Sequence, residues 1–448
     1  MSNPPAEKAP AADAGAPAGT QPESAYRWYA LAVLIAVYAM NTFDRNVLSL
    51  VLQPIKVEFS LSDTQLGLLS GLVFAAAYGL AGIPLGMLID RLSRPRFLAV
   101  LLAIWSGLTA LTGTAQNFAT LIATRMGIGA SEAPAQPIAL SLISDYFRPA
   151  QRALATGLFM TSIPLGTFLG FLVAGAVIER YGWRAGFFVA GLPGLLLAVV
   201  VATTLRDVAR GHSERTGAAA APRAAAPIAE TLRYILRARA LLKMIVGTVL
   251  MVVVAGSFGV WLPTFLVRNH AMSMQVVATA VAVISGLAGV IGSPLGGFIA
   301  DRLGRRDVRW QPRLAALVTA ASLPLMAVGL LSQTTWIAVV FATCWTVMGT
   351  MVYAPAYSLC ASLAPAHMRG TTLAIMAVGS NVIGFGLGSQ LVGLMSDFFA
   401  RYSAPDSLRY ALVALLVFKL AAATLYWRAA RDVQAGLDQA VREGARSA

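Results

Sequence analysis

The chain has 448 residues, of which 57% are hydrophobic and only 12% are charged, and its mean hydropathy is +0.70. Soluble chains carry about 25% charged residues, so this composition excludes an ordinary soluble domain and predicts an all-α integral membrane protein. The net charge is +14, but the basic residues gather between apolar stretches, which argues against a nucleic-acid-binding protein.

Twelve apolar stretches follow one another, each near the roughly 20 residues that cross a bilayer as helix. They lie at residues 28–50, 65–89, 97–115, 119–146, 153–178, 185–205, 242–267, 275–300, 313–331, 335–363, 370–397 and 408–428. Most of the 34 Lys and Arg fall in the tails and the even-numbered connections, so the positive-inside rule predicts cytoplasmic termini. Residues 1–26 are Ala/Pro-rich without an apolar core, which predicts a disordered cytoplasmic tail and no cleavable signal peptide.

Spans 1 and 4 carry charges at membrane depth. Asp44 and Arg45 lie in the first, with Asn41 one turn before the arginine, and Arg125 and Glu132 lie in the fourth. A charge at the bilayer centre costs about 2.5 to 3.5 kcal/mol, so these side chains must face a cavity or protein. Asp44 and Arg45 point about 100° apart on a helix, so each needs a partner on another helix.

A similar loop follows the second and eighth spans, where "GIPLGMLIDRLSRPR" (82–96) is echoed by "GSPLGGFIADRLGRR" (292–306). The echo indicates two six-span halves made from one repeat, as in secondary transporters. We expect the glycine before each aspartate to admit a neighbouring helix, and the aspartate to reach a helix end and latch one conformation. A plain positive-inside turn is the alternative. The predicted gating residues are Gly86, Asp90, Arg91, Arg94, Gly297, Asp301, Arg302, Arg305 and Arg306.

The longest polar stretch, residues 206–241, separates a bundle at 27–205 from a bundle at 242–428, and a second cytoplasmic tail follows at 429–448. Within it, "IAETLRYILRARALLK" predicts a short amphipathic helix on the membrane surface, although a charged tether fits as well.

The second half lacks counterparts of the span 4 charges, since Tyr353 aligns with Glu132. It offers instead an aromatic and weakly polar wall that suits the tail of an amphiphile with its anionic head at Arg45, or ordinary packing. The wall residues, predicted to bind substrate, are Trp261, Phe265, Tyr353, Tyr357 and Asn381. Cys344 and Cys360 share span 10 and are expected to be packing residues.

The second loop resembles the signature G-x-x-x-D-R-x-G-R-R of the major facilitator superfamily, and the first copy, with Gly86, Asp90, Arg91 and Arg94, carries Ser93 where the second glycine is usual. The resemblance covers residues 27–432 and implies a major facilitator fold, with 12 transmembrane helices in two pseudo-symmetric six-helix bundles. In that architecture spans 1 and 4 line the cavity, which implies a contact between Arg45 and Glu132. Span 12 is peripheral there, which favours packing for Lys419.

"NTFDRNVLSLVLQPIK", "RMGIGASEAP" and "ERYGWRAGFF" are similar to the spinster branch, known for proton-linked movement of lysophospholipids and sphingosine-phosphate-type lipids. The resemblance places proton coupling on Glu132 and Asp44, because a carboxyl that alternates between ion-paired and protonated forms couples protons to movement. A permanent buried ion pair is the alternative for Glu132. Arg45, Arg125 and Asn41 are the predicted substrate-binding residues, although Arg125 could only satisfy backbone carbonyls.

These features predict a proton-coupled secondary active transporter of an amphiphilic anionic lipid that works by alternating access. Small organic anions, such as sugar acids or aromatic acids, are the alternative substrates, and a non-transporting receptor is a third possibility. Lipid transport predicts a lateral opening between spans 5 and 8 or 2 and 11. No G-x-x-x-x-G-K-[ST] loop and no nucleophile–base pattern occur, which argues against a pump or an enzyme. We expect no cofactor and no metal, and a monomer in a bacterial inner membrane.

Overall fold

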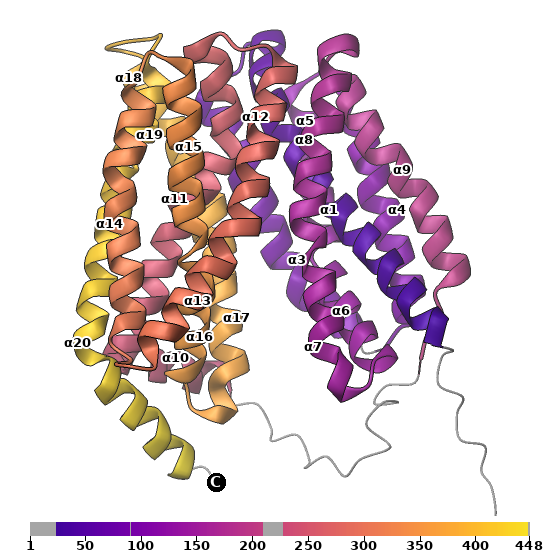
Figure 1. Ribbon diagram of the computed structural model, residues 1–448. Helices are drawn as coiled ribbons and strands as arrows, with labels where there is room; N and C mark the ends of the chain where they lie inside the picture. Colours follow the sequence, from indigo (N-terminus) through magenta and orange to yellow (C-terminus); the bar gives the residue numbers. More distant parts are fainter. Residues whose placement is uncertain (1–23, 90, 209–226, 447–448) are drawn as a thin grey trace, which may run out of the picture.

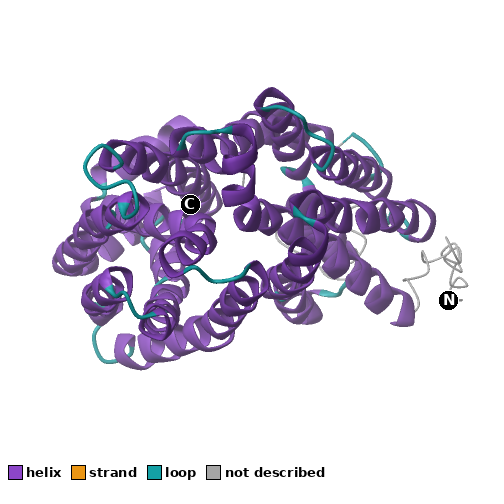
Figure 2. Ribbon diagram, turned by 90° about the horizontal axis from the view of Figure 1, so that it is seen from above, coloured by secondary structure: helices purple, strands orange, loops and turns teal. Residues whose placement is uncertain are grey.

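The structure, a computed structural model, describes residues 24–89, 91–208 and 227–446. Within these ranges every regular element is a helix, as predicted. Figures 1 and 2 show the helices in two groups, one formed by the chain before the linker and one by the chain after it. Asp90, most of the predicted N-terminal tail and the middle of the linker lie outside the described residues.

The first bundle runs from α1 to α9 and includes one π-helical turn, η1. Its elements are α1 (Ser24–Phe59), α2 (Asp63–Gly67), η1 (Leu68–Leu72), α3 (Val73–Ile89), α4 (Arg94–Thr112), α5 (Phe118–Glu132), α6 (Ala135–Tyr146), α7 (Pro149–Met160), α8 (Ser162–Tyr181) and α9 (Trp183–Thr204). Because α1 begins at Ser24, residues 24–26 are helical, and the expectation of disorder to residue 26 is wrong for them.

The second bundle follows α10 (Ile228–Arg237), which is the amphipathic helix predicted in the linker. Its elements are α11 (Arg239–His270), α12 (Met274–Leu287), η2 (Ala288–Gly292), α13 (Ser293–Gly304), α14 (Trp310–Leu331), α15 (Thr335–Thr350), α16 (Tyr353–Ser362), η3 (Ala366–Met368), α17 (Arg369–Gly379), η4 (Ser380–Leu387), α18 (Gly388–Phe399), α19 (Ser407–Ala414) and α20 (Leu416–Arg446). The segments η2 and η4 are π-helical and η3 is a 3₁₀ turn.

Eleven helical segments among the described residues are long and apolar enough to cross a membrane. The twelfth predicted span, residues 119–146, is present but broken into α5 and α6 at Ala133 and Pro134, so neither half reaches 18 residues. Proline has no N–H to continue the helical ladder, which explains the break. Charged Glu132 therefore ends a half-helix rather than standing inside a continuous one.

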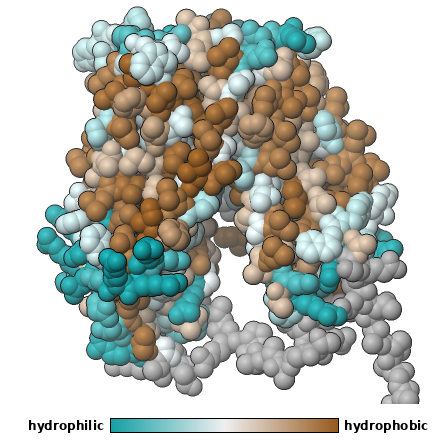
Figure 3. All heavy atoms as spheres, in the orientation of Figure 1, coloured by the Kyte–Doolittle hydropathy of each residue, from teal (hydrophilic) through white to brown (hydrophobic). Residues whose placement is uncertain are grey.

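The two bundles meet at one face of the molecule and stand apart at the other. We call the face that carries α10 and the end of α20 the linker face, at the bottom of Figure 1, and the opposite face the far face. Near the far face α2 packs against α18, and α8 packs along α12. Towards the linker face the space-filling view shows a hollow between the bundles (Figure 3).

Candidate functional site

An ion pair between α1 and α5 lies inside the first bundle. Arg45 Nε donates to Glu132 Oε2 at 2.7 Å, and the Glu132 side chain is fully buried while that of Arg45 is 26% exposed. The contact between Arg45 and Glu132 that the superfamily resemblance implied is therefore present.

Two aromatic rings on α3 hold the arginines of this cluster. The Arg45 guanidinium lies 4.9 Å from the ring centroid of Phe74 and 5.2 Å from that of Tyr78, and the Arg125 guanidinium lies 4.6 Å from Phe74. Cations over ring faces are attracted by the ring quadrupole, more strongly where water is excluded. Gly129 makes the approach possible, because a Cβ there would lie 2.7 Å from the Phe74 carbonyl oxygen. The sequence analysis did not identify Phe74 or Tyr78 as part of the site.

Asp44, Asn41 and Arg125 complete the cluster but make few bonds. Asp44 is 1% exposed; its Oδ2 accepts from Thr109 Oγ1 at 3.5 Å, while Oδ1 has no hydrogen-bond partner. Arg125 is 6% exposed and forms no ion pair with any residue that the structure describes. The cluster thus brings together all the span 1 and span 4 residues predicted for the site, with one strong ion pair among them.

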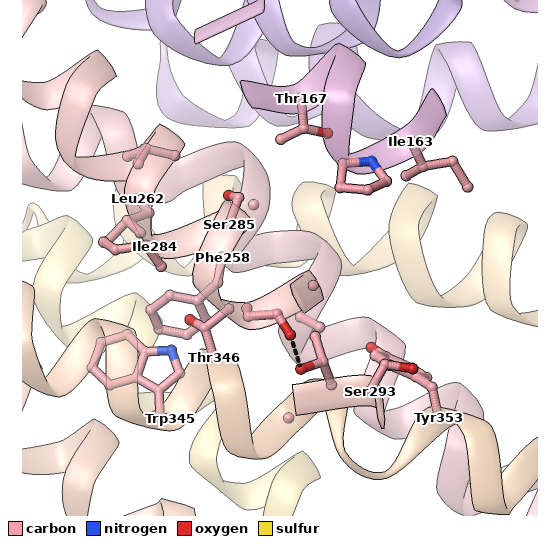
Figure 4. A pocket seen from close by; sticks show the side chains of 18 of the residues that line it. Ile163, Thr167, Phe258, Leu262, Ile284, Ser285, Ser293, Trp345, Thr346 and Tyr353 are labelled. Carbon is pink, nitrogen blue, oxygen red and sulfur yellow. Dashed lines mark hydrogen bonds between the residues drawn. The ribbon is translucent and has the colours of Figure 1, made fainter. Parts of the chain in front are cut away.

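A cavity of about 780 Å³ lies between the bundles, and the predicted substrate-binding residues Asn41, Arg45 and Arg125 are not among its lining residues. Asn46, which follows Arg45 in the chain, lines this cavity and donates a hydrogen bond to Thr167 of α8. In Figure 4 the first bundle contributes Ile163 and Thr167, and the second bundle contributes the larger aromatic part of the wall. The labelled residues of that second part are Phe258, Leu262, Ile284, Ser285, Ser293, Trp345, Thr346 and Tyr353.

Most residues of the predicted aromatic wall do not line this cavity. Tyr353 does line the cavity, but Trp261 is fully buried and donates from Nε1 to the Ser389 carbonyl and hydroxyl, both at 3.1 Å. Phe265 is 1% exposed and packs on His270. Asn381 turns back to donate to the Ala377 carbonyl. These side chains are used in helix packing or local bonds rather than in the cavity wall, which Tyr357 also does not reach.

Lys419 contradicts the expectation that span 12 is only peripheral. Its side chain is 3% exposed and lines the cavity, so it does not extend to the membrane surface. Among the described lining residues it is the one charged side chain. We assigned Lys419 to packing because span 12 is peripheral in the superfamily's architecture. An isolated lysine in an apolar span nevertheless indicates a functional position by itself.

At the far face a buried ionic network joins the two bundles. Asp63, at the start of α2, is 2% exposed and accepts from Arg268 Nη1 and Nη2 at 2.8 and 2.7 Å, and from Lys56 at 2.6 Å. Ser396 of α18 donates to the same carboxylate, at 2.6 Å. Asp397 of α18 accepts from the backbone N–H groups of Asp63 and Thr64, and so caps the helix of the other bundle. We call these six residues the far-face network.

The described residues of the repeated loops, which leave out Asp90, form no ion pair with the opposite bundle in this conformation. A Cβ added to Gly86 or Gly297 would meet no neighbouring atom within 4 Å, so the predicted close helix approach at these glycines is wrong here. The close approach occurs instead at Gly296, where a Cβ would lie 2.0 Å from the Met351 carbonyl oxygen. The cause is the separation of the bundles on this face. The loop residues Arg91, Asp301, Arg302, Arg305 and Arg306 are exposed.

Arg94 is the exception among these loop residues, because it is 1% exposed. It pairs with Asp145 of α6 and with Asp207, and donates to Ser141 Oγ at 2.9 Å. Asp145 and Ser141 belong to the first bundle, and Asp207 directly follows it. Arg94 therefore ties α4 to α6 within one bundle, and it makes no latch to the other.

The family model of the Major Facilitator Superfamily matches residues 34–433. The chain belongs to the major facilitator superfamily. Members of this family are transporters, so the protein is a transporter and not an enzyme. This facilitator is 28% identical over 403 residues to an MFS-type efflux pump of Mycolicibacterium smegmatis, covering 90% of this chain and 92% of that protein.

Two further relatives differ in what their names say they carry. The sphingosine-1-phosphate transporter SPNS2 of Xenopus tropicalis is 25% identical over 415 residues, which cover 87% of this facilitator and 78% of that protein. A probable L-galactonate transporter of Escherichia coli is 29% identical over 283 residues, 61% of each chain.

Among solved structures, this facilitator is similar to a bacterial homologue of the human lysosomal transporter Spinster in an inward-facing, unoccupied conformation. The TM-score is 0.82 at 26% identity, and the match covers 93% of this facilitator and 99% of that chain. The facilitator is therefore spinster-like, with the twelve-helix fold that the sequence predicted.

Proposed function

We propose that this facilitator is a proton-coupled secondary transporter that works by alternating access, with Glu132 as the coupling residue. The observation that supports the proposal is the buried Arg45–Glu132 ion pair at 2.7 Å, whose arginine directly precedes Asn46 of the cavity wall. A buried pair contributes little net stability compared with apolar packing of the same volume, so a membrane protein gains little from it as a structural element alone.

The coupling step follows from the charges. When Glu132 takes up a proton it no longer needs Arg45, and the arginine loses its one ion-pair partner among the described residues. Asp44 Oδ1 has no hydrogen-bond partner, so a second unpaired carboxyl oxygen is buried in the same cluster. Proton release reverses the change. Each protonation state thus favours a different arrangement of α1 and α5, which is the requirement for coupling to a conformational change.

The substrate class that the cavity favours is an amphiphilic anion such as a lysophospholipid or a sphingosine-phosphate-like lipid. The wall is mostly apolar and takes residues from α7–α8, which form span 5, and from α12–α13, which form span 8, as well as from other helices of the second bundle. On this side the hollow is visible from the bilayer direction in Figure 3. The sphingosine-1-phosphate relative agrees with such a substrate. The galactonate relative supports small organic acids as the second candidate.

We also propose that the linker face is cytoplasmic, with both tails on that side of a bacterial inner membrane. Exposed arginines of the loops and of α10 gather there, as the positive-inside rule requires. The division into bundles at 27–205 and 242–428, and a monomeric state, belong to the same proposal.

Proteoliposome flux under an imposed pH gradient tests the coupling. Glu132→Gln removes the titrating group but keeps the shape, so we expect gradient-driven accumulation of a fluorescent lysophospholipid to be lost. Binding should stay within about threefold of wild type, equivalent to about 0.7 kcal/mol. Galactonate is tested as a second substrate in the same assay, because small organic acids are the alternative substrate class.

The control variant is Glu58→Gln, which neutralises an exposed carboxylate that pairs with Arg184 outside the cavity. Its flux should equal that of wild type. If Glu132→Gln keeps wild-type dependence on the gradient, Glu132 is not the coupling residue.

A further inference from the structure

Lys419 occupies a position that the proposed coupling mechanism does not use. It lies on α20, four residues after Leu415, where the chain passes from α19 to α20. Its side chain is 3% exposed and reaches the inter-bundle cavity together with Met326, Trp345 and Phe258. The lysine therefore presents a cation to the cavity from the second bundle, while the charge cluster belongs to the first.

No residue that the structure describes neutralises this ammonium. It forms no ion pair, and its polar contact is with the thioether sulfur of Met326, 3.9 Å from Nζ. Ionised groups buried in apolar surroundings cost several kcal/mol unless they are paired. A charge retained there at such a cost is better explained by an anion that enters the cavity than by packing, for which a methionine would be adequate.

Three of the other polar groups of the wall are already engaged within the protein, while Ser285, Ser293 and Tyr353 add a few hydroxyls to an otherwise apolar lining. Thr346 donates to the Ala342 carbonyl, Thr350 donates to the Ala288 carbonyl, and Asn46 donates to Thr42 and Thr167. A polyhydroxy acid needs many free donors and acceptors, whereas an amphiphile needs one anion-binding group and apolar walls. The wall meets the second description.

Arg45 is a poorer site for the anion than its position suggests. Glu132 already accepts from its Nε at 2.7 Å, so a second anion there would have to displace the carboxylate. Lys419 imposes no such competition. This geometry places the anion and the coupling proton at different positions, one in each bundle.

We propose that Lys419 binds the anionic head group of the transported amphiphile, with the alkyl chain directed towards the linker face, where α7 and α13 line the cavity. This rests on the proposed function and assigns the head-group subsite within it. The recognised chemistry is a phosphate or carboxylate on an apolar chain. Ammonium-to-anion hydrogen bonds are about twice as strong as neutral ones, which gives the site its preference for charge.

Equilibrium binding to the purified full chain in detergent tests the assignment with two probes that differ by one phosphate, lysophosphatidic acid and the monoacylglycerol of the same chain. Lys419→Met should weaken lysophosphatidic acid binding by about tenfold or more and leave monoacylglycerol binding unchanged. Lys419→Arg should stay within about threefold of wild type for both. Arg428→Met is the matched control, because it removes an exposed positive charge from the same helix.

Glycerol phosphate and galactonate distinguish a lipid head group from a free anion. Lys419-dependent binding of either small anion alone, without lysophosphatidic acid, would overturn the amphiphile assignment. Equal losses with both lipids, or no loss with any anion, would overturn the head-group role. These assays use no pH gradient, so their result is independent of the Glu132→Gln flux experiment, and either proposal can fail alone.

A packing role predicts the opposite change in stability. If Lys419 serves only to fill space, Lys419→Met should leave the thermal midpoint unchanged or lower it. If it is an uncompensated cation kept for binding, its removal should raise the midpoint of the ligand-free protein. Lysophosphatidic acid should then raise the midpoint of wild type more than that of the variant. A lower midpoint for the variant, with binding unchanged, contradicts the proposal.

Discussion

Single side chains decide how this site handles charge. Glu132 is fully buried with one strong partner, Arg45, and the ring faces of Phe74 and Tyr78 stabilise that partner from the other side. Removing one member of a buried pair leaves a buried charge, which costs about 3 to 5 kcal/mol, whereas removing both is far less damaging. Each side chain of the pair is therefore stable as a buried charge only while the other is present.

That dependence can be measured in the thermal unfolding of detergent-solubilised variants. Arg45→Met should lower the midpoint more than the double variant Arg45→Met/Glu132→Gln, because the single change leaves Glu132 ionised and alone. At low pH the difference should shrink, since a protonated Glu132 needs no cation. Equal midpoints for the two variants at neutral pH would show that Arg45 and Glu132 are not energetically coupled.

The sequence was enough to predict the Arg45–Glu132 pair. It was not enough to predict the other residues of the site, and both outcomes have a physical reason. Charges in apolar spans are rare and visible, so Arg45 and Glu132 were identified as candidates. An aromatic residue in a span is equally compatible with core and cavity, which is why Trp261 was assigned wrongly. Lys419 was visible too, but its assignment depended on which face of span 12 meets the cavity.

At the scale of elements, many spans are irregular, although α1 and α11, which meet across the interface between the bundles, are unbroken. Span 2 contains η1, span 8 contains η2 and span 11 contains η4, while spans 4, 5 and 10 are broken near Ala133, Thr161 and Met351. Where η1 meets η4, a Cβ on Gly71 would lie 2.6 Å from the Gly386 carbonyl oxygen. π-helical turns are common at functional sites and add local freedom to a helix.

Proline was a partial guide to these irregularities. Pro134 stands at the break of span 4, and Pro294 follows η2, but Pro263 lies within the unbroken helix α11. The sequences of η1, "LLSGL", and η4, "SNVIGFGL", contain no proline. Their π-helical geometry depends on packing between the two bundles. Such long-range packing cannot be predicted from a local sequence pattern.

The far-face network holds helices of the two bundles together, and this role can be tested by mutation. It joins α2 to α11 and α18 through Asp63, so Arg268→Gln should weaken the closed far face. Val392 on α18 is fully buried, and Val392→Cys in a background without Cys344 and Cys360 reports opening. We expect labelling by a membrane-impermeant maleimide to rise by about tenfold, equivalent to about 1.4 kcal/mol.

Glu58→Gln is the control here as well, since the Glu58–Arg184 pair lies within the first bundle and is exposed. It should leave labelling of Val392→Cys unchanged. Equal labelling in Arg268→Gln and Glu58→Gln would mean that the far-face network does not hold the bundles together. Asp63 and Arg268 are 205 residues apart, which is why sequence spacing could not reveal the contact.

At the scale of the whole molecule, the twelve spans and the internal repeat were enough to predict two bundles of a major facilitator. The spans depend on hydropathy and length alone, while the major facilitator fold was implied by the resemblance of the loop signature. The conformation was beyond the sequence, because the ion pairs that close the far face, such as that of Asp63 with Arg268, join residues 205 positions apart.

Locking the far face tests alternating access directly. Ser70 and Ser389 lie in opposite bundles with hydroxyl oxygens 2.9 Å apart, and both are buried. In the cysteine-free background, Ser70→Cys/Ser389→Cys should form a disulfide with a membrane-permeant oxidant, and transport should stop and recover on reduction. Each single variant should transport under oxidant. Undiminished transport by the cross-linked protein would rule out opening at this face.

The far-face network also bears on which monolayer supplies the proposed lipid substrate. A molecule held together at one face and parted at the other opens its cavity towards the parted face alone. Under the proposed function an amphiphile would enter from the lipid on that side, and its head group would move to Lys419 while its chain stays among lipid tails. Rupture of the ion pairs around Asp63 would be the event that transfers the molecule to the opposite leaflet.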